Sequence, residues 1–304
     1  MRFAAHETFH PRFGWLKKGY DHVQRDPAIF HNKEQAHIDL GVGKNMANAV
    51  RYWLLAFGIV SEVENHRGYE PTEFGDLIFG ENGFDTYLED PATLWLLHYK
   101  LVTNEELATA WYFIFNSFAF RKFTIDDISH ELQHFVALVA PTKSIAPSSL
   151  EKDISCILRM YVSNIDNSKI AEDSLDSPFT VLDLIHKYEG MKQYSFHVGE
   201  KNNLPPEIIV ALCLYYVTSQ ELEAKTISLS KLANEKKSPG MVCKIGEKEI
   251  EEAIEKTIMK NNSLNSSIGI SNQAGVAHLS INSDAKTLWY EILNQYYEKS
   301  SVLV

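Results

Sequence analysis

The chain has 304 residues, of which 45% are apolar and 23% are charged, a globular composition that excludes a disordered or fibrous protein. Its length is sufficient for two domains with separate cores. The formal charge of −11 excludes nonspecific adhesion to nucleic acid over the whole surface. Residues 1–70 nevertheless carry 9 basic and 8 acidic side chains, so any site for a polyanion is expected near the N-terminus.

The cysteines and the apolar runs indicate the compartment. Cys156, Cys213 and Cys243 are too few for a disulfide framework and too widely spaced for a close-spaced zinc cluster. The chain starts with no apolar signal region, and its longest apolar run, residues 108–120, is too short to cross a bilayer. We therefore expect a cytoplasmic protein without membrane contact.

A polar and aromatic segment, residues 6–19, opens the chain. Its charged and imidazole side chains suit contacts with phosphates and bases, and they are His6, Glu7, Arg12, Lys17 and Lys18. Phe9, Phe13 and Trp15 lie between them. The alternative is an N-terminal arm that covers an apolar groove with these aromatic rings.

Residues 32–79 predict two helices, a hairpin and a third helix. Asn32 and Gln35 have the spacing of a capping box for a first helix over 33–40, and a second helix follows Gly41-Val-Gly43 and runs to about Phe57. Residues 59–63 alternate like a strand, 65–68 form a turn, and the chain returns before a helix over 72–79. This order predicts a winged helix-turn-helix.

The second of these helices has an apolar and a polar face. Its polar face comprises Lys44, Asn45, Asn48, Arg51 and Tyr52. Asparagine amides pair with adenine edges, and arginine and lysine bind guanine or phosphate. We therefore expect this face to contact DNA, with an ordinary solvated helix face as the alternative.

Two further segments carry chemically active side chains. Glu89 and Asp90 precede an apolar helical run that starts after Pro91, where they can hold a divalent cation or cap the helix. His98 lies within that run and starts an imperfect phosphodiesterase pattern. The alternative for His98 is a helix-borne histidine near the core.

Residues 130–134 match the HExxH pattern of zinc proteases, with His130 and His134 one turn apart. Thr124 and Asp127 predict a capping box at the start of this helix. The apolar stripe of the helix places both histidines on the opposite face, toward solvent. A zinc metalloprotease is therefore only a minor alternative.

The predicted domain boundary lies at residues 141–149, where two prolines and four hydroxyl residues suggest a linker. It separates a winged-helix-like half, 1–140, from a helical domain, 150–304. In the second half, periodicity predicts helices over 149–162, 205–219, 228–237, 246–260 and 283–299, and a strand over 275–281. The expected fold class is mainly α with short β hairpins.

Strings throughout the chain resemble a bacterial family, first labelled only as a domain of unknown function, that includes SspB of DNA phosphorothioation systems. They cover residues 6–9, 12–19, 40–46, 51–53, 88–98, 110–116, 150–153, 158–161 and 238–240. The resemblance implies a role beside a cysteine desulfurase, an adenylating sulfur-transfer enzyme and an ATPase. In that role the protein nicks one strand of double-stranded DNA so that sulfur can enter the backbone.

Candidate site residues follow from residue type within these segments, because strand nicking usually needs carboxylate-held divalent cations and a basic group. The predicted catalytic residues are Glu7, Asp90, His6 and His98, and the predicted Mg²⁺ or Mn²⁺ ligands are Glu7, Glu89 and Asp90. Arg12 is the expected phosphate clamp, and Lys17 and Lys18 are further DNA contacts. A noncatalytic DNA-binding adaptor that recruits the sulfur-transfer enzymes is the main alternative, and a homodimer is left open.

Overall fold

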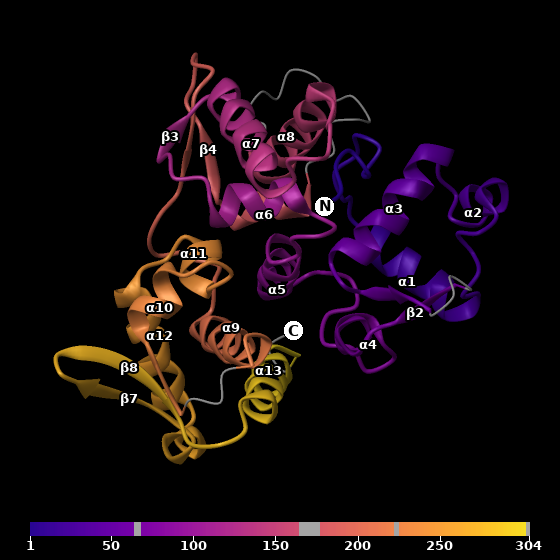
Figure 1. Ribbon diagram of the computed structural model, residues 1–304. Coiled ribbons are helices and arrows are strands. Elements are labelled where there is room, and N and C mark those ends of the chain that lie inside the picture. Colours follow the sequence, from indigo (N-terminus) through magenta and orange to yellow (C-terminus); the bar gives the residue numbers. More distant parts are fainter. Residues whose placement is uncertain (64–67, 164–176, 222–224, 302–304) are drawn as a thin grey trace. The chain divides into compact units, whose positions relative to one another are not determined.

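The computed structural model describes residues 1–63, 68–163, 177–221 and 225–301 (Figure 1). The chain divides into two compact units, Met1–Phe196 and His197–Val304. It is mainly helical with small antiparallel sheets, as the sequence predicts. Along the chain, the boundary between the units lies between Phe196 and His197, whereas the predicted linker lies at 141–149. The assignment of DNA binding and nicking to residues 1–140 remains a prediction.

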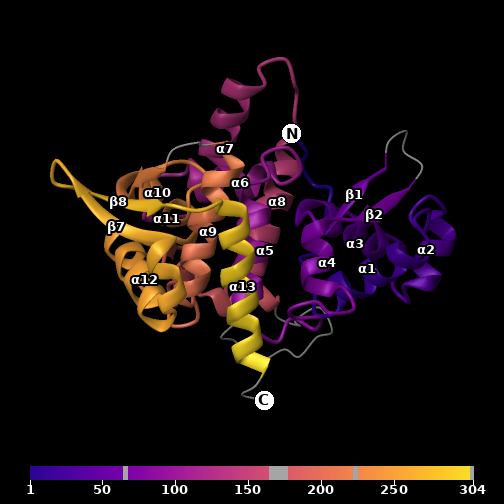
Figure 2. The same ribbon diagram turned by 90° about the horizontal axis from the view of Figure 1, so that it is seen from below.

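The N-terminal part of the first unit contains every element predicted for residues 32–79. Its elements are α1 (Trp15–Arg25), α2 (Lys33–Asp39), α3 (Lys44–Ala56), β1 (Val60–Glu62), β2 (Tyr69–Pro71) and α4 (Glu73–Phe79), and they group together in Figures 1 and 2. Both α1 and α2 pack on α3. Strands β1 and β2 pair antiparallel, with Val60 opposite Pro71. Of the turn predicted at 65–68, residues 65–67 lie outside the described residues.

Local hydrogen bonds explain how α2 begins and ends. The Asn32 side chain accepts from the backbone N–H groups of Glu34 and Gln35, so it caps α2 as predicted. Gln35 does not complete the capping box, because its side chain donates to Asp39. Gly41 then adopts a φ of 60°, a left-handed conformation that favours glycine. The resulting turn leads directly into α3.

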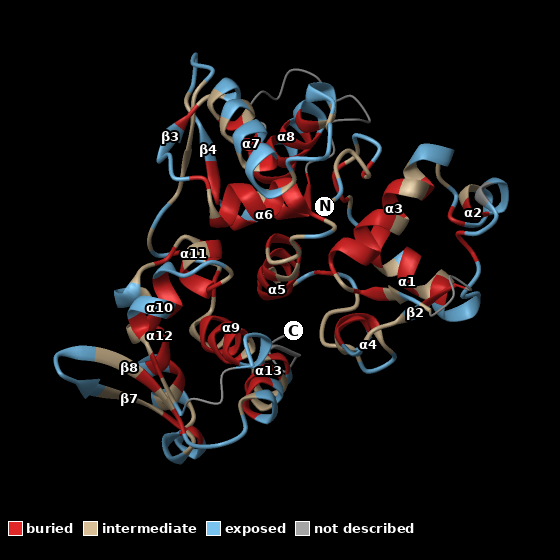
Figure 3. Cartoon of the chain, viewed as in Figure 1, coloured by how far each residue is buried: buried red, intermediate tan, exposed pale blue. Residues whose placement is uncertain are grey.

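The rest of the first unit is built around two buried helices. Its elements are α5 (Pro91–Val102), α6 (Thr109–Asn116), β3 (Lys122–Phe123), α7 (Ile125–Val139), α8 (Pro147–Tyr161), η3 (Pro178–Leu182), β4 (Ile185–Lys187) and β5 (Tyr194–Phe196). Helices α5 and α6 are buried along nearly their whole length (Figure 3). Helix α8 packs on α7, α6 and η3, so residues 150–161 belong to this unit.

The second unit packs α9 against α12 and α13 and carries a sheet in the order β6-β8-β7. Its elements are α9 (Pro206–Ser219), β6 (Thr226–Ser228), α10 (Leu229–Asn234), α11 (Pro239–Cys243), α12 (Glu247–Lys260), η4 (Asn262–Ser266), β7 (Ile268–Gln273), β8 (Val276–Ile281) and α13 (Ala285–Ser301). The helices and the strand predicted for this region are confirmed, while β6, α11, η4 and β7 lacked a prediction.

Two further expectations concern cysteines and membranes. The three cysteines are buried and form no disulfide, and burial raises the pKa of the Cys243 thiol to about 12. Among the described residues, no helix has both the length and the apolar character needed to span a membrane.

Candidate nucleic-acid interface and the predicted site residues

The exposed surface of α3 is confined to its first two turns. Lys44 and Asn45 are exposed, and Asn48 and Arg51 are partly exposed. The prediction that Tyr52 shares this polar face is wrong, because its side chain is buried and its hydroxyl donates to the Leu107 carbonyl at 3.1 Å. From Tyr52 onward the helix is buried on every side. Only the N-terminal end of α3 can therefore meet a large partner.

The four side chains at this end of α3 have few competing partners. Lys44 Nζ lies 2.6 Å from a carboxylate oxygen of Glu34, and its ammonium lowers the pKa of that exposed carboxyl. Arg51 donates to the Tyr69 hydroxyl at 3.2 Å. Within the described part of the chain, the amides of Asn45 and Asn48 make no side-chain hydrogen bond. This surface therefore presents cationic and amide groups together.

The cations of α1 lie beside the turn that precedes α3. Lys18 Nζ donates to the Leu40 carbonyl at 3.2 Å, and His22 Nε2 donates to the Asp39 carbonyl at 2.9 Å. Both groups satisfy carbonyls at the C-terminal end of α2, where the positive charge of Lys18 is favourable. Burial lowers the pKa of His22, so its ring donates as a neutral imidazole. Lys17 pairs with Asp21 at 2.6 Å. Lys18 thus lies beside the turn that leads into α3, whereas Lys17 lies near the Phe79 carbonyl at the end of α4.

Arg12, the predicted phosphate clamp, lies beside aromatic rings. Its guanidinium carbon is 5.9 Å from the centre of the Phe9 ring and 5.5 Å from that of Trp15. Such contacts hold a guanidinium over aromatic faces. Arg12 is partly exposed, so part of its side chain lies at the surface.

His6 is fully buried instead of facing a ligand. Its Nε2 donates to Asp153 Oδ1 at 2.7 Å, and the same carboxylate oxygen accepts from the Ala4 N–H at 2.8 Å. The His6 ring lies 6.1 Å from the Trp53 ring and 5.6 Å from the Trp111 ring. Burial raises the pKa of Asp153, and the hydrogen bond from His6 opposes that shift. This geometry favours a structural role for His6.

Further hydrogen bonds attach the N-terminal arm, residues 2–12, to α3 and α8. Trp53 Nε1 donates to the Phe9 carbonyl at 3.0 Å, and the Arg159 guanidinium donates to the Thr8 carbonyl. Sequence analysis missed Asp153 and Arg159. Asp153 is a polar residue on the apolar stripe of α8, between Leu150 and Ile157, and that position was the available signal.

His98 is also fully buried. Its Nδ1 lies 2.8 Å from the Tyr161 hydroxyl, and its ring meets Phe115 and Trp95 edge to face. These contacts match the alternative of a histidine within the core. A proton-transfer role for His98 would require the surrounding aromatic side chains to move.

The three predicted metal ligands do not converge. Glu7 is exposed in a tight turn, whereas Asp90 caps α5 by accepting from the Ala92 N–H at 2.9 Å. Among the described residues, Glu7, Glu89 and Asp90 belong to no group of three potential metal ligands whose donor atoms lie within 4.8 Å of one another. These carboxylates thus form no assembled Mg²⁺ or Mn²⁺ site, and their metal role stays a prediction.

Two substitutions of Asp90 separate capping from metal binding. We expect Asp90→Ala to lower the free energy of unfolding by about 1 kcal/mol, because the first turn of α5 loses its cap. Asp90→Asn should keep stability, because asparagine caps a helix equally well, and it should keep nicking if the carboxylate serves only as this cap. A metal-binding Asp90 instead predicts loss of nicking in Asp90→Asn, because asparagine is a poor substitute for a charged ligand. Urea denaturation and a nicking assay on both variants provide the check. Loss of nicking in a stable Asp90→Asn protein would restore Asp90 as a metal ligand.

The HExxH histidines face solvent, as predicted. The His130 side chain is 83% exposed, His134 is exposed, and Leu132 between them is fully buried. The predicted capping box of Thr124 and Asp127 is present. A zinc protease needs both histidines directed at one metal within a cleft. The exposed position of this pair gives the protease alternative no support.

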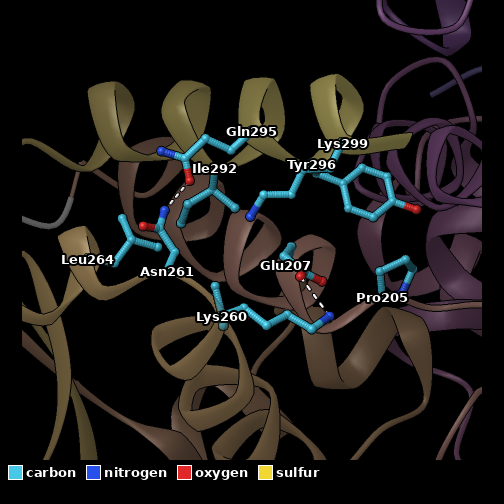
Figure 4. A pocket seen from close by; sticks show the side chains of 10 residues that line it. Pro205, Glu207, Lys260, Asn261, Leu264, Ile292, Gln295, Tyr296 and Lys299 are labelled. Carbon is cyan, nitrogen blue, oxygen red and sulfur yellow. Dashed lines mark hydrogen bonds and ion pairs between the residues drawn. The ribbon is translucent and has the colours of Figure 1, made fainter. Parts of the chain in front are cut away.

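A pocket of about 390 Å³ in the second unit lies between α9, α12, η4 and α13 (Figure 4). Glu207 accepts from Lys260 Nζ at 2.9 Å on one wall, and the ammonium of Lys299 extends into the pocket. None of the predicted site residues lines it. It therefore shares no residue with the candidate DNA-contacting surface.

Comparisons with known proteins agree with this fold. A family model described as "Protein of unknown function (DUF4007)" matches residues 3–297. The "Magnesium ion-bound SspB crystal structure" is similar with a TM-score of 0.89, and the "SspB crystal structure" with 0.87. Each is 34% identical, over 97% of this chain and 88% of the SspB chain. No curated protein matches. The chain therefore belongs to the DUF4007 family, the family of SspB.

Proposed function

We propose that the protein is a DNA-binding, strand-nicking component of a DNA phosphorothioate modification and defence system. Its family and its 34% identity to SspB over nearly the whole chain support its assignment to such a system. The resemblance to SspB implies the nicking. The observation that carries DNA binding is the cluster of exposed cationic and amide groups on the first two turns of α3.

The elements around α3 support a winged helix-turn-helix. Helix α2, the glycine turn, α3 and the β1–β2 hairpin follow one another in the order of that motif. A recognition helix contacts base edges mainly through its N-terminal residues, and the N-terminal end is the exposed part of α3. In this proposal Asn45 and Asn48 read bases, while Lys44 and Arg51 contact guanine or phosphate. Lys17, Lys18 and Arg12 add phosphate contacts.

Glu34 opposes this proposed interface, and its removal gives a directional prediction. Its carboxylate neutralises Lys44 and would lie close to the DNA backbone. We expect Glu34→Gln to raise duplex affinity, by less than about fivefold because exposed ion pairs are weak. Fluorescence anisotropy with a labelled duplex measures the change, with Glu81→Gln as a control for loss of an exposed acid elsewhere. A lower affinity in Glu34→Gln would count against Lys44 as a DNA contact.

A noncatalytic adaptor is the second candidate function. It is favoured by the burial of His6 and His98 and by the separation of the three predicted carboxylate ligands. Such an adaptor would bind DNA through α3 and recruit the cysteine desulfurase, the adenylating enzyme and the ATPase. Both candidates place the protein in the cytoplasm, where the chromosome lies.

The proposed cofactor of nicking is a divalent cation, Mg²⁺ or Mn²⁺. One SspB structure similar to this chain is magnesium-bound. A cation beside a phosphodiester stabilises the charge that develops on its oxygens. The predicted ligand residues, Glu7, Glu89 and Asp90, form no assembled site among the described residues.

A plasmid assay separates the two candidates. Purified protein is incubated with supercoiled plasmid and Mg²⁺ or Mn²⁺, alone and together with the phosphorothioation proteins, and the reaction is repeated with EDTA. We expect nicked circles that require the metal. If no nicked circle forms in any mixture while the protein still binds the plasmid, the nickase proposal fails and the adaptor remains.

A further inference from the structure

A second cavity, of about 390 Å³, lies in the first unit beside the start of α1. Its lining residues are Gly14, Lys17, Lys18, Asp21, Thr86, Tyr87 and Leu88. Tyr87 is 71% exposed, and within the described part of the chain it makes no hydrogen bond or ring contact. An exposed tyrosine of this kind contributes little to the stability of the fold. Its position at a cavity therefore indicates a role in binding a ligand.

The loop that carries Tyr87 is held in place by its own hydrogen bonds. The Asp85 carboxylate accepts from the N–H groups of Glu89 and Asp90 at 2.9 and 3.0 Å. Leu88 is buried and adopts a φ of 57°, which is uncommon for leucine. With Leu88 turned inward, Tyr87 is left on the outside. A tyrosine on a fixed loop loses little conformational entropy when a ligand stacks on it.

The charges around the cavity favour an anion. Lys17 and Lys18 outnumber Asp21, the one acidic lining residue among the described residues, and Asp21 is paired with Lys17 at 2.6 Å. Lys18 also contacts the Leu40 carbonyl, directly before the glycine turn that leads into α3. One cation of the cavity therefore also reaches the turn that leads into α3.

We infer that this cavity binds an unpaired nucleotide of a DNA strand, with its base stacked on Tyr87 and its phosphate beside Lys17 and Lys18. Proteins that bind single strands combine aromatic rings for the bases with cations along the backbone. A base inside a duplex cannot reach the ring, because both of its faces are covered by its neighbours. Extruding a base costs least where it is mismatched or already unpaired. This inference rests on the proposed DNA-binding function.

The test compares two short duplexes, one fully paired and one with a central unpaired 2-aminopurine. Extrusion from the duplex relieves the quenching of 2-aminopurine by neighbouring bases, and stacking on a tyrosine quenches the probe again. Lower fluorescence in the wild-type complex than in the Tyr87→Ala complex therefore reports the contact itself. For the full chain we expect Tyr87→Ala to lose the quenching and to weaken binding of the unpaired duplex about tenfold, within the range measured for base stacking. Tyr87→Phe should retain both signals. Tyr290→Ala, at an exposed tyrosine of α13, is the matched control.

The outcomes distinguish this inference from the proposed function. A wild-type protein that binds neither duplex would remove the DNA-binding proposal, and this inference with it. Duplex binding that depends on Lys44 but shows no quenching, or an equal loss for both duplexes in Tyr87→Ala, would overturn the nucleotide pocket alone. Melting temperatures of the variants should match wild type, because Tyr87 is exposed.

Discussion

Replacing Asp153 by alanine is expected to lower the free energy of unfolding by about 2–5 kcal/mol, since each buried hydrogen-bonding group left without a partner costs about 1–3 kcal/mol. Asp153 accepts from both His6 and the Ala4 N–H, so the substitution leaves one buried and one partly buried donor without an acceptor. His6 is fully buried beside Trp53 and Trp111, where water cannot replace the carboxylate. The N-terminal arm would lose its main attachment to α8.

Urea denaturation followed by tryptophan fluorescence measures this loss. Glu151→Ala, on the exposed side of the same helix, is the matched control and should change stability by less than about 0.5 kcal/mol. The double variant His6→Phe/Asp153→Leu should recover most of the stability, since apolar replacement of both partners removes the desolvation cost. An Asp153→Ala protein as stable as the control would show that the pair does not hold the arm.

Simultaneous replacement of Lys44, Asn48 and Arg51 by alanine is expected to weaken duplex binding about 100-fold or more, since base and phosphate contacts each contribute about 1–3 kcal/mol. The first two turns of α3 would lose both charge and amide groups while their apolar face is unchanged. The dependence of affinity on salt should also flatten by about two units, one for each lost phosphate contact. Fluorescence anisotropy over a range of salt concentrations measures both quantities.

The control for this variant is Lys236→Ala/Lys237→Ala, in the acidic second half of the chain. It removes two cations without touching α3, so its effect on affinity should be far smaller. Equal losses in the two variants would mean that DNA binding has no preferred place near the N-terminus. Circular dichroism confirms that the α3 variant keeps its helical content.

Local sequence patterns predicted much of the fold because their causes are local. Thr124 and Asp127 lie three residues apart and make the capping box themselves, and Asn32 likewise caps α2. The faces of α7 followed from periodicity, which is why His130 was expected in solvent. Helix α1 begins within residues 6–19, a segment whose sequence indicated functional residues only, and neither its start at Trp15 nor its end at Arg25 was predicted.

Contacts between distant residues explain the rest. Tyr52 was assigned to the polar face of α3, yet its hydroxyl meets a carbonyl 55 residues away. His6 and Asp153 are separated by 147 residues, so no spacing in the sequence could show that the histidine is buried. For the same reason, residue type was the only basis for proposing the three carboxylate ligands, and the sequence could not show whether they converge.

Site-directed photocrosslinking tests the central claim, that DNA binds over the exposed end of α3. Asn45 is replaced by the photocrosslinking amino acid benzoylphenylalanine, and Lys236 is replaced in the same way as the control; both positions are exposed. If DNA binds there, irradiation with a labelled duplex gives a covalent protein–DNA adduct from position 45 and little adduct from position 236. Intact duplex binding with no adduct at position 45, or equal adducts at both positions, would contradict the claim.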